Sequence, residues 1–165
     1  MAKPKAPATP SPKRHRAILL IALALLVITG SMMLTSRPDV GIIIVTFPSG
    51  KEMVTEVADT PEKMLFALAF RDDLPDNTGV LYIFDKSGPH QLRTKGFRIL
   101  VDMIWLDESR YVVHLVKYAE PCSQDPCPYF GPPPENARYV IQTAAGFIDQ
   151  EALRPGMELT FTLKL

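Results

Sequence analysis

The 165-residue sequence predicts a β-rich α+β domain behind one N-terminal apolar segment. Short β-branched or alternating segments, separated by turn residues, recur from residue 41 to the end of the chain, a pattern typical of strands. Only one segment, 61–69, has apolar residues at helical spacing. The apolar fraction of 47% is large enough for a core. We therefore expect a single domain with one short helix and a curled or barrel-like sheet.

The first 36 residues differ in composition from the rest. Residues 1–16 are rich in Pro, Ala and Lys, so we expect a disordered cytoplasmic tail. Residues 17–34 carry no charge, and 18 helical positions extend roughly 27 Å, close to the roughly 30 Å hydrocarbon core. Residues 17–36 are thus expected to be a transmembrane anchor, with a cleaved signal peptide as the alternative. In both cases residues 37–165 form an extracytoplasmic domain, anchored in the cell membrane or, after cleavage, periplasmic or secreted.

The zero net charge conceals an uneven distribution. Five of the 18 basic residues lie in residues 1–36, which hold no acid, so 13 basic residues face 18 acidic ones in the domain. A nucleic-acid surface requires a basic patch on the folded part. We expect no nucleic-acid partner.

The domain elements follow in order. Residues 41–47 and 53–58 predict a hairpin around the turn 48–50, and Asp59 or Thr60 can cap a helix that begins at Pro61. The further expected strands are 80–84, ended by turn residues, then 97–106, 111–118 and 137–143. A helical turn over 149–153 and an alternating, half-buried strand over 157–165 complete the expected order.

The two cysteines, Cys122 and Cys127, have four residues between them in a proline-rich loop. Outside the cytoplasm thiols oxidise, so a local disulfide is expected, contributing roughly 2 kcal/mol. Metal capture, thiol exchange and free thiols are the alternatives. The spacing is not C-x-x-C, and no second cysteine pair completes a zinc site. His90 and His114 could join the sulfurs as ligands, or His114 could simply occupy a solvated strand face and His90 a turn.

Several segments together resemble the family catalogued as domain of unknown function 192 (DUF192), over residues 54–163. They are VADTPEK at 57–63, FR at 70–71, LPD at 74–76, GVLYIF at 79–84, VDM at 101–103, WLD at 105–107, the proline-cysteine loop 121–129, ARYVI at 137–141, AG at 145–146 and PG at 155–156. The resemblance implies a compact, barrel-like fold and no established activity. The chain departs from the family pattern at RTKGF, 93–97, where relatives have Trp-Met-Lys-Asn-Thr, and at ALA, 67–69, where they have Gly-Leu-Met. It resembles a divergent member.

Five polar residues are candidates for ligand binding: Arg71, Lys95, Asp102, Tyr129 and Arg138. Asp102 lies in an apolar strand, where an unpaired carboxylate is costly, so we expect a charge-assisted bond from Arg138 or Lys95. The functional hypothesis is that these groups converge near the cysteine loop and bind a small polar or anionic ligand.

Three functions remain open. No serine-hydrolase motif, phosphate-binding Gly-rich loop or H-E-x-x-H occurs, so the first hypothesis is a membrane-tethered binding or accessory module without catalysis or cofactor. Its partner would be a small molecule or an envelope protein. The second is a redox or metal-handling protein that uses the cysteine pair. The third, with the least support, is an enzyme built on Asp102, Lys95 and Arg71.

Overall fold

The structure is a computed structural model, and it describes residues 16, 18–27 and 41–163. The chain divides into two compact units, Met1–Asp39 and Val40–Leu165. In the first unit residues 18–27 are helical and their side chains are exposed. Most of the expected tail, 1–16, and half of the expected anchor, 17–36, lie outside the described residues. Within the described parts of the chain, no helix has both the length and the hydropathy required to cross a bilayer.

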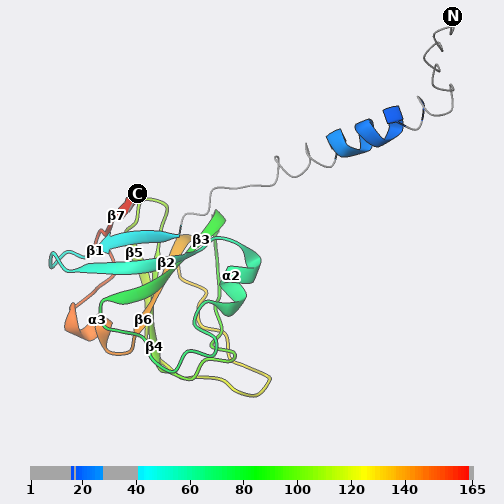
Figure 1. Ribbon diagram of the computed structural model, residues 1–165. Helices are drawn as coiled ribbons and strands as arrows, with labels where there is room; N and C mark the ends of the chain where they lie inside the picture. The colour runs from blue at the N-terminus through cyan, green and yellow to red at the C-terminus, as the bar shows by residue number, and fades with distance from the viewer. Residues whose placement is uncertain (1–15, 17, 28–40, 164–165) are drawn as a thin grey trace, which may run out of the picture. The chain divides into compact units, whose positions relative to one another are not determined.

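The second unit is built on one seven-stranded sheet (Figure 1). Two short helices accompany it, α2 (Pro61–Phe66) and α3 (Phe147–Gln150). The strands are β1 (Ile42–Thr46), β2 (Glu52–Ala58), β3 (Thr78–Gly88), β4 (Val101–Leu106), β5 (Val112–Ala119), β6 (Ala137–Ala144) and β7 (Thr160–Leu163). The expected strands and the expected helix at Pro61 are therefore present, with shifted ends.

The strand order in the sheet is β5-β4-β6-β3-β2-β1-β7. The hairpin β1–β2 is confirmed, whereas β2 and β3 are parallel and connected through α2. All other pairs are antiparallel. The sheet curls but does not close, because within the described residues β5 and β7 do not pair. The start of β5 and the segment before β7 meet at an isolated bridge between Tyr111 and Glu158 and through backbone bonds of Val112 with Gly156 and Met157, but these contacts do not continue into a ladder between the two strands.

Local chemistry explains the ends of several elements. Thr60 caps α2 through a 3.3 Å bond from the Lys63 amide to its hydroxyl, and Pro61 occupies the first helical position, where its missing N–H costs nothing. The turn residues 85–88 do not end β3, which continues through an irregularity between Ile83 and Gly88. Residues 97–100, expected in a strand, precede β4, because Phe97 closes a turn onto Thr94 with a 3.1 Å backbone bond.

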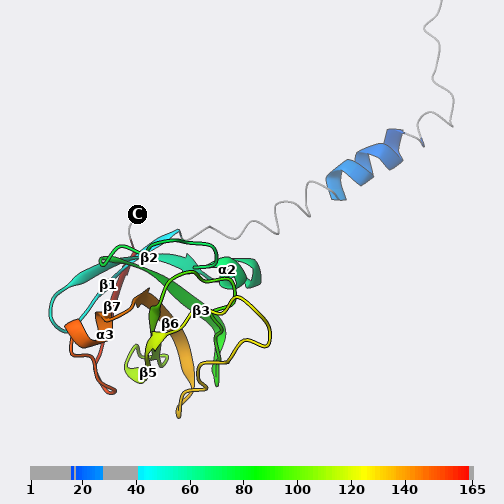
Figure 2. The same cartoon turned by 90° about the horizontal axis from the view of Figure 1, so that it is seen from below.

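Both faces of the sheet are buried, so neighbouring strand residues belong to different cores. Leu81 and Ile104 lie in one core with α3, while the adjacent Tyr82 and Trp105 lie in the other. The first core lies on the face of the sheet that packs against α3, whose place beside the curled sheet is visible in Figure 2. The second core is covered by the segment after α2 and by the loops 89–100 and 120–136.

Candidate ligand cavity and cysteine loop

A cavity of about 360 Å³ opens on the concave face of the sheet. Five strands contribute its lining, which consists of Ile43, Val57, Asp59, Ile83, Tyr139, Phe161 and Leu163. All but Asp59 are apolar or aromatic. The residues lie at the end of the sheet where β1 begins and β2 ends, because Ile43 pairs with Leu163 and Val57 pairs with Leu81.

The wall of the cavity combines an aromatic pair and an ion pair. The rings of Tyr139 and Phe161 meet edge to face, with centroids 5.3 Å apart. Asp59 accepts a 3.2 Å hydrogen bond from the ammonium of Lys63, one helical turn away in sequence. The only acid in the lining is therefore already paired, and the remaining surface favours apolar contact.

The sequence did not reveal this cavity. Alternation along β1, β2 and β3 indicates that Ile43, Val57 and Ile83 share one face of the sheet. The cavity requires in addition that β7 lie beside β1 and that the sheet curl, and both are long-range pairings without a local signal.

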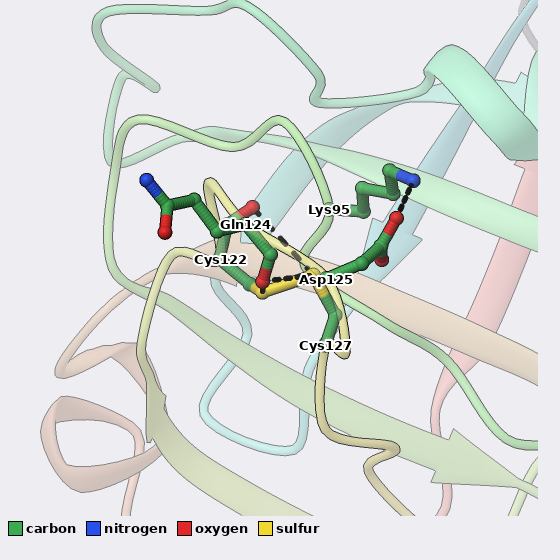
Figure 3. A network of polar contacts seen from close by, with 5 residues as sticks. All are labelled: Lys95, Cys122, Gln124, Asp125 and Cys127. Carbon is green, nitrogen blue, oxygen red and sulfur yellow. Dashed lines mark hydrogen bonds and ion pairs between the residues drawn. A yellow bond between two sulfur atoms is a disulfide. The ribbon is translucent and has the colours of Figure 1, made fainter.

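The cysteine loop is closed by a disulfide between Cys122 and Cys127, with Cα atoms 5.7 Å apart, as predicted (Figure 3). Cys127 is buried and Cys122 is partly exposed. The loop also pairs with the segment 92–97. Leu92 and Phe130 exchange two backbone bonds of 3.1 and 2.8 Å, and the Cys122 amide donates to Thr94 over 3.1 Å. The loop is thus held by backbone pairing as well as by the disulfide.

Two basic side chains, Lys95 and Arg93, contact residues of this loop. Lys95 forms an ion pair with Asp125 (Figure 3), and its hydrogen bond holds the pKa of the Asp125 carboxyl below its usual value. The guanidinium of Arg93 lies 4.8 Å from the centre of the exposed Tyr129 ring. Both pairs are solvent-exposed, so they contribute little to stability. Lys95 and Tyr129 are accordingly the two ligand candidates that do lie at the cysteine loop.

Asp102 has different partners from those expected. The prediction of Arg138 or Lys95 is wrong, because the fully buried carboxylate accepts two backbone N–H groups, Tyr118 at 2.8 Å and Ile148 at 2.9 Å. Ile148 is in the first turn of α3, whose capping residue, Gly146, supplies no side chain. Asp102 therefore satisfies the amino end of α3 from a neighbouring strand, where a negative charge is favourable.

The side chains of the remaining candidates, Arg71 and Arg138, make no hydrogen bond or ion pair with the cysteine loop among the described residues. Arg71 makes a bidentate pair with Glu56, through bonds of 3.0 and 2.6 Å. The Arg138 side chain makes none of the hydrogen bonds or ion pairs found among residues 41–163. The contacts give Arg71 and Asp102 partners outside the cysteine loop, and the convergence of these groups on a ligand stays a prediction.

The two histidines have partners of their own. His90 stacks on Phe84, with ring centroids 3.7 Å apart, and its Nε2 lies 2.8 Å from the Lys86 carbonyl oxygen. His114 packs beside Trp105 at 5.3 Å. No group of three or more potential metal-binding side chains occurs within the described part of the chain. A disulfide sulfur is not a thiolate, so the cysteines do not serve as ligands in this state.

The sequence analysis did not predict a buried hydrogen bond between two polar side chains, Tyr82 and Gln142. Tyr82 donates a 2.8 Å hydrogen bond to Gln142, and both side chains are almost fully buried. Burial raises the pKa of the Tyr82 hydroxyl. The Gln142 amide nitrogen has no hydrogen-bond partner among the described residues. Only the pairing of the adjacent strands β3 and β6 brings these groups together.

Comparison with solved structures shows the fold. A candidate transcription regulator from Sinorhizobium meliloti is similar with a TM-score of 0.64 at 20% identity, covering 73% of this chain and 92% of that one. A protein of unknown function from Novosphingobium aromaticivorans gives a TM-score of 0.63 at 21% identity, covering 72% and 83%. No curated protein matches the sequence.

The family model described as "Uncharacterized ACR", DUF192, matches residues 44–161. These residues include all of the second core and most of the cavity lining. The chain belongs to the DUF192 family.

Proposed function

We propose that this protein is a non-catalytic binding module, held at the outer face of the cell membrane by residues 17–36, and that the cavity on the concave face takes a small apolar ligand. The observation that carries the proposal is the cavity itself, about 360 Å³ and lined by six apolar or aromatic residues and one acid. Ligand pockets commonly measure roughly 300–1,000 Å³, are mainly apolar, and occur at the mouths of barrel-like sheets.

The lining favours an uncharged ligand. Its one acid, Asp59, is paired with Lys63 inside the domain. A charged ligand would have to displace that pair or remain unpaired against Ile43, Val57 and Phe161, which costs free energy. The Tyr139 and Phe161 rings offer faces and edges for an aromatic or branched apolar group.

Two features support the location. The helical residues 18–27 are apolar throughout, and they belong to the charge-free run 17–34. A disulfide between Cys122 and Cys127 suits an oxidising compartment. A redox or metal-handling role for that pair has less support, because Cys127 is buried and the loop is also held by backbone pairing.

The test uses the full-length protein in lipid nanodiscs and N-phenyl-1-naphthylamine, an uncharged aromatic probe. Energy transfer from Trp105, the single tryptophan, reports the probe near the domain. Leu163→Asp places a charge in the cavity lining, whereas Thr162→Asp changes an exposed neighbour on the same strand. Leu163 is 58% exposed, so a bound probe can cover the open part of its side chain, and that contact is worth about 1–2 kcal/mol. The aspartate loses this contact and its carboxylate also loses water when the probe covers it, so Leu163→Asp should weaken probe binding about tenfold. Equal affinities for the two variants would exclude the cavity as the binding site.

A further inference from the structure

Three exposed apolar side chains cluster at and just after helix α2. Leu65, Phe66 and Phe70 are 65%, 57% and 63% exposed, and we refer to them as the α2 patch. Ala69 joins Phe66 through a 3.1 Å backbone bond, so the chain turns back and keeps Phe70 near the end of the helix. Single exposed apolar residues are ordinary, but a group containing two phenylalanines marks an interaction surface.

Phe70 has an unfavourable backbone conformation at this surface. Its φ is +66°, a left-handed value that is rare for a bulky residue. The Phe70 amide donates a 2.8 Å bond to the Gly96 carbonyl, and the ring stands over Gly96, where an added Cβ would lie 3.6 Å from it. The backbone at Phe70 is therefore strained although its ring remains exposed to solvent. Backbone strain of this kind often occurs at functional sites, such as those that hold a ligand.

The α2 patch lies at the end of the domain where the chain arrives from the N-terminus. The Gly41 carbonyl accepts a 3.3 Å bond from the Val57 amide, and α2 begins four residues after Val57. Both views place α2 at the end of the sheet where β1 begins (Figures 1 and 2). If the anchor ends at Ser36, the five residues to Gly41 extend at most about 18 Å.

We propose that the α2 patch docks the domain onto the lipid bilayer. The inference rests on the membrane tether in the proposed function, because the short connection keeps this end of the domain at a high effective concentration near the headgroups. The neighbouring basic residues are paired, Lys63 with Asp59 and Arg71 with Glu56, and Glu62 in the first turn of α2 is acidic and exposed, so the surroundings of the patch do not favour anionic headgroups. The contact is therefore apolar, and vesicles of uncharged net composition suffice for it.

The experiment reconstitutes the full-length protein into phosphatidylcholine vesicles. A single added cysteine, Leu65→Cys, carries a nitrobenzoxadiazole label, and phosphatidylcholine brominated on its acyl chains quenches a label that enters the bilayer. The matched control is Glu52→Cys. Glu52 is an exposed residue at the start of β2, and it pairs with Thr46 at the end of β1. Docking predicts at least twofold quenching and a blue shift for the Leu65 label and none for the Glu52 label.

Adding Phe66→Ser and Phe70→Asn to the labelled Leu65→Cys variant removes the rest of the patch. Asparagine tolerates a positive φ, so this change does not add strain. The quenching should then fall toward the control value. If the Leu65 label stays unquenched while a carbonate wash leaves the protein in the membrane, the docking is refuted and the tether stands. Release of the protein by carbonate refutes the membrane tether and, with it, the docking. Ligand binding in the cavity is tested separately by the probe experiment, so its outcome does not depend on the docking.

Discussion

Replacing Asp102 with alanine should be among the most destabilising single changes in the domain. The carboxylate is fully buried and accepts the amides of Tyr118 and Ile148. The substitution leaves two N–H groups without acceptors, and each costs about 1–3 kcal/mol. It also removes a negative charge from the amino end of α3, worth up to about 1 kcal/mol. We therefore expect a loss of about 2–7 kcal/mol, a large part of the roughly 5–15 kcal/mol typical of a domain.

The measurement is urea unfolding of the full-length protein, followed by the fluorescence of Trp105, which is completely buried. Asp102→Asn provides a graded comparison, because its amide oxygen can accept one of the two bonds and its NH2 group opposes the other donor. The loss should be roughly half that of alanine. Asp76→Ala, an exposed change in the loop before β3, should leave the midpoint unaltered. A loss below about 1 kcal/mol for Asp102→Ala would contradict the capping argument.

Two further predictions concern the disulfide and the alkaline range. Replacing Cys122 and Cys127 by serine should cost about 2 kcal/mol by the chain-entropy model and leave the domain folded, because the loop is also held by backbone pairing; thermal melts check the first point and the retained Trp105 signal the second. The hydrogen bond to Asp149 raises the pKa of the Tyr118 hydroxyl, so its stabilising effect is complete below the unfolded value of about 10 and is lost as pH rises further. The stability difference between wild type and Tyr118→Phe should therefore shrink above about pH 10, and parallel curves from pH 7 to 12 would contradict this.

Local signals in the sequence were sufficient for the elements themselves. Pro61 after Thr60 predicts the start of α2, and the alternation from residue 157 predicts the strand that becomes β7. The disulfide followed from compartment and spacing. These predictions succeed because each depends on residues within one turn or one strand.

Features that depend on pairing between distant strands were not predictable. The parallel neighbours β2 and β3, and the contact of β1 with β7, carry no signal in either strand alone. The partners of Asp102 illustrate the same limit. Sequence reasoning correctly required a partner for a buried carboxylate, but it searched among charged side chains. The Asp102 carboxylate instead accepts hydrogen bonds from two backbone amides. Tyr118 lies at an irregularity in the pairing of β4 with β5, and Ile148 lies in α3.

The pairing of β1 with β7 gives the domain a particular order of assembly during synthesis. The first strand to emerge from the ribosome keeps one edge unpaired until the last strand has been made. At about 5–20 residues per second this interval is on the order of ten seconds. Phe161 and Leu163 are missing from the cavity wall throughout it. A nascent chain is therefore exposed to wrong strand pairing, and lacks part of its cavity wall, until β7 has been translated.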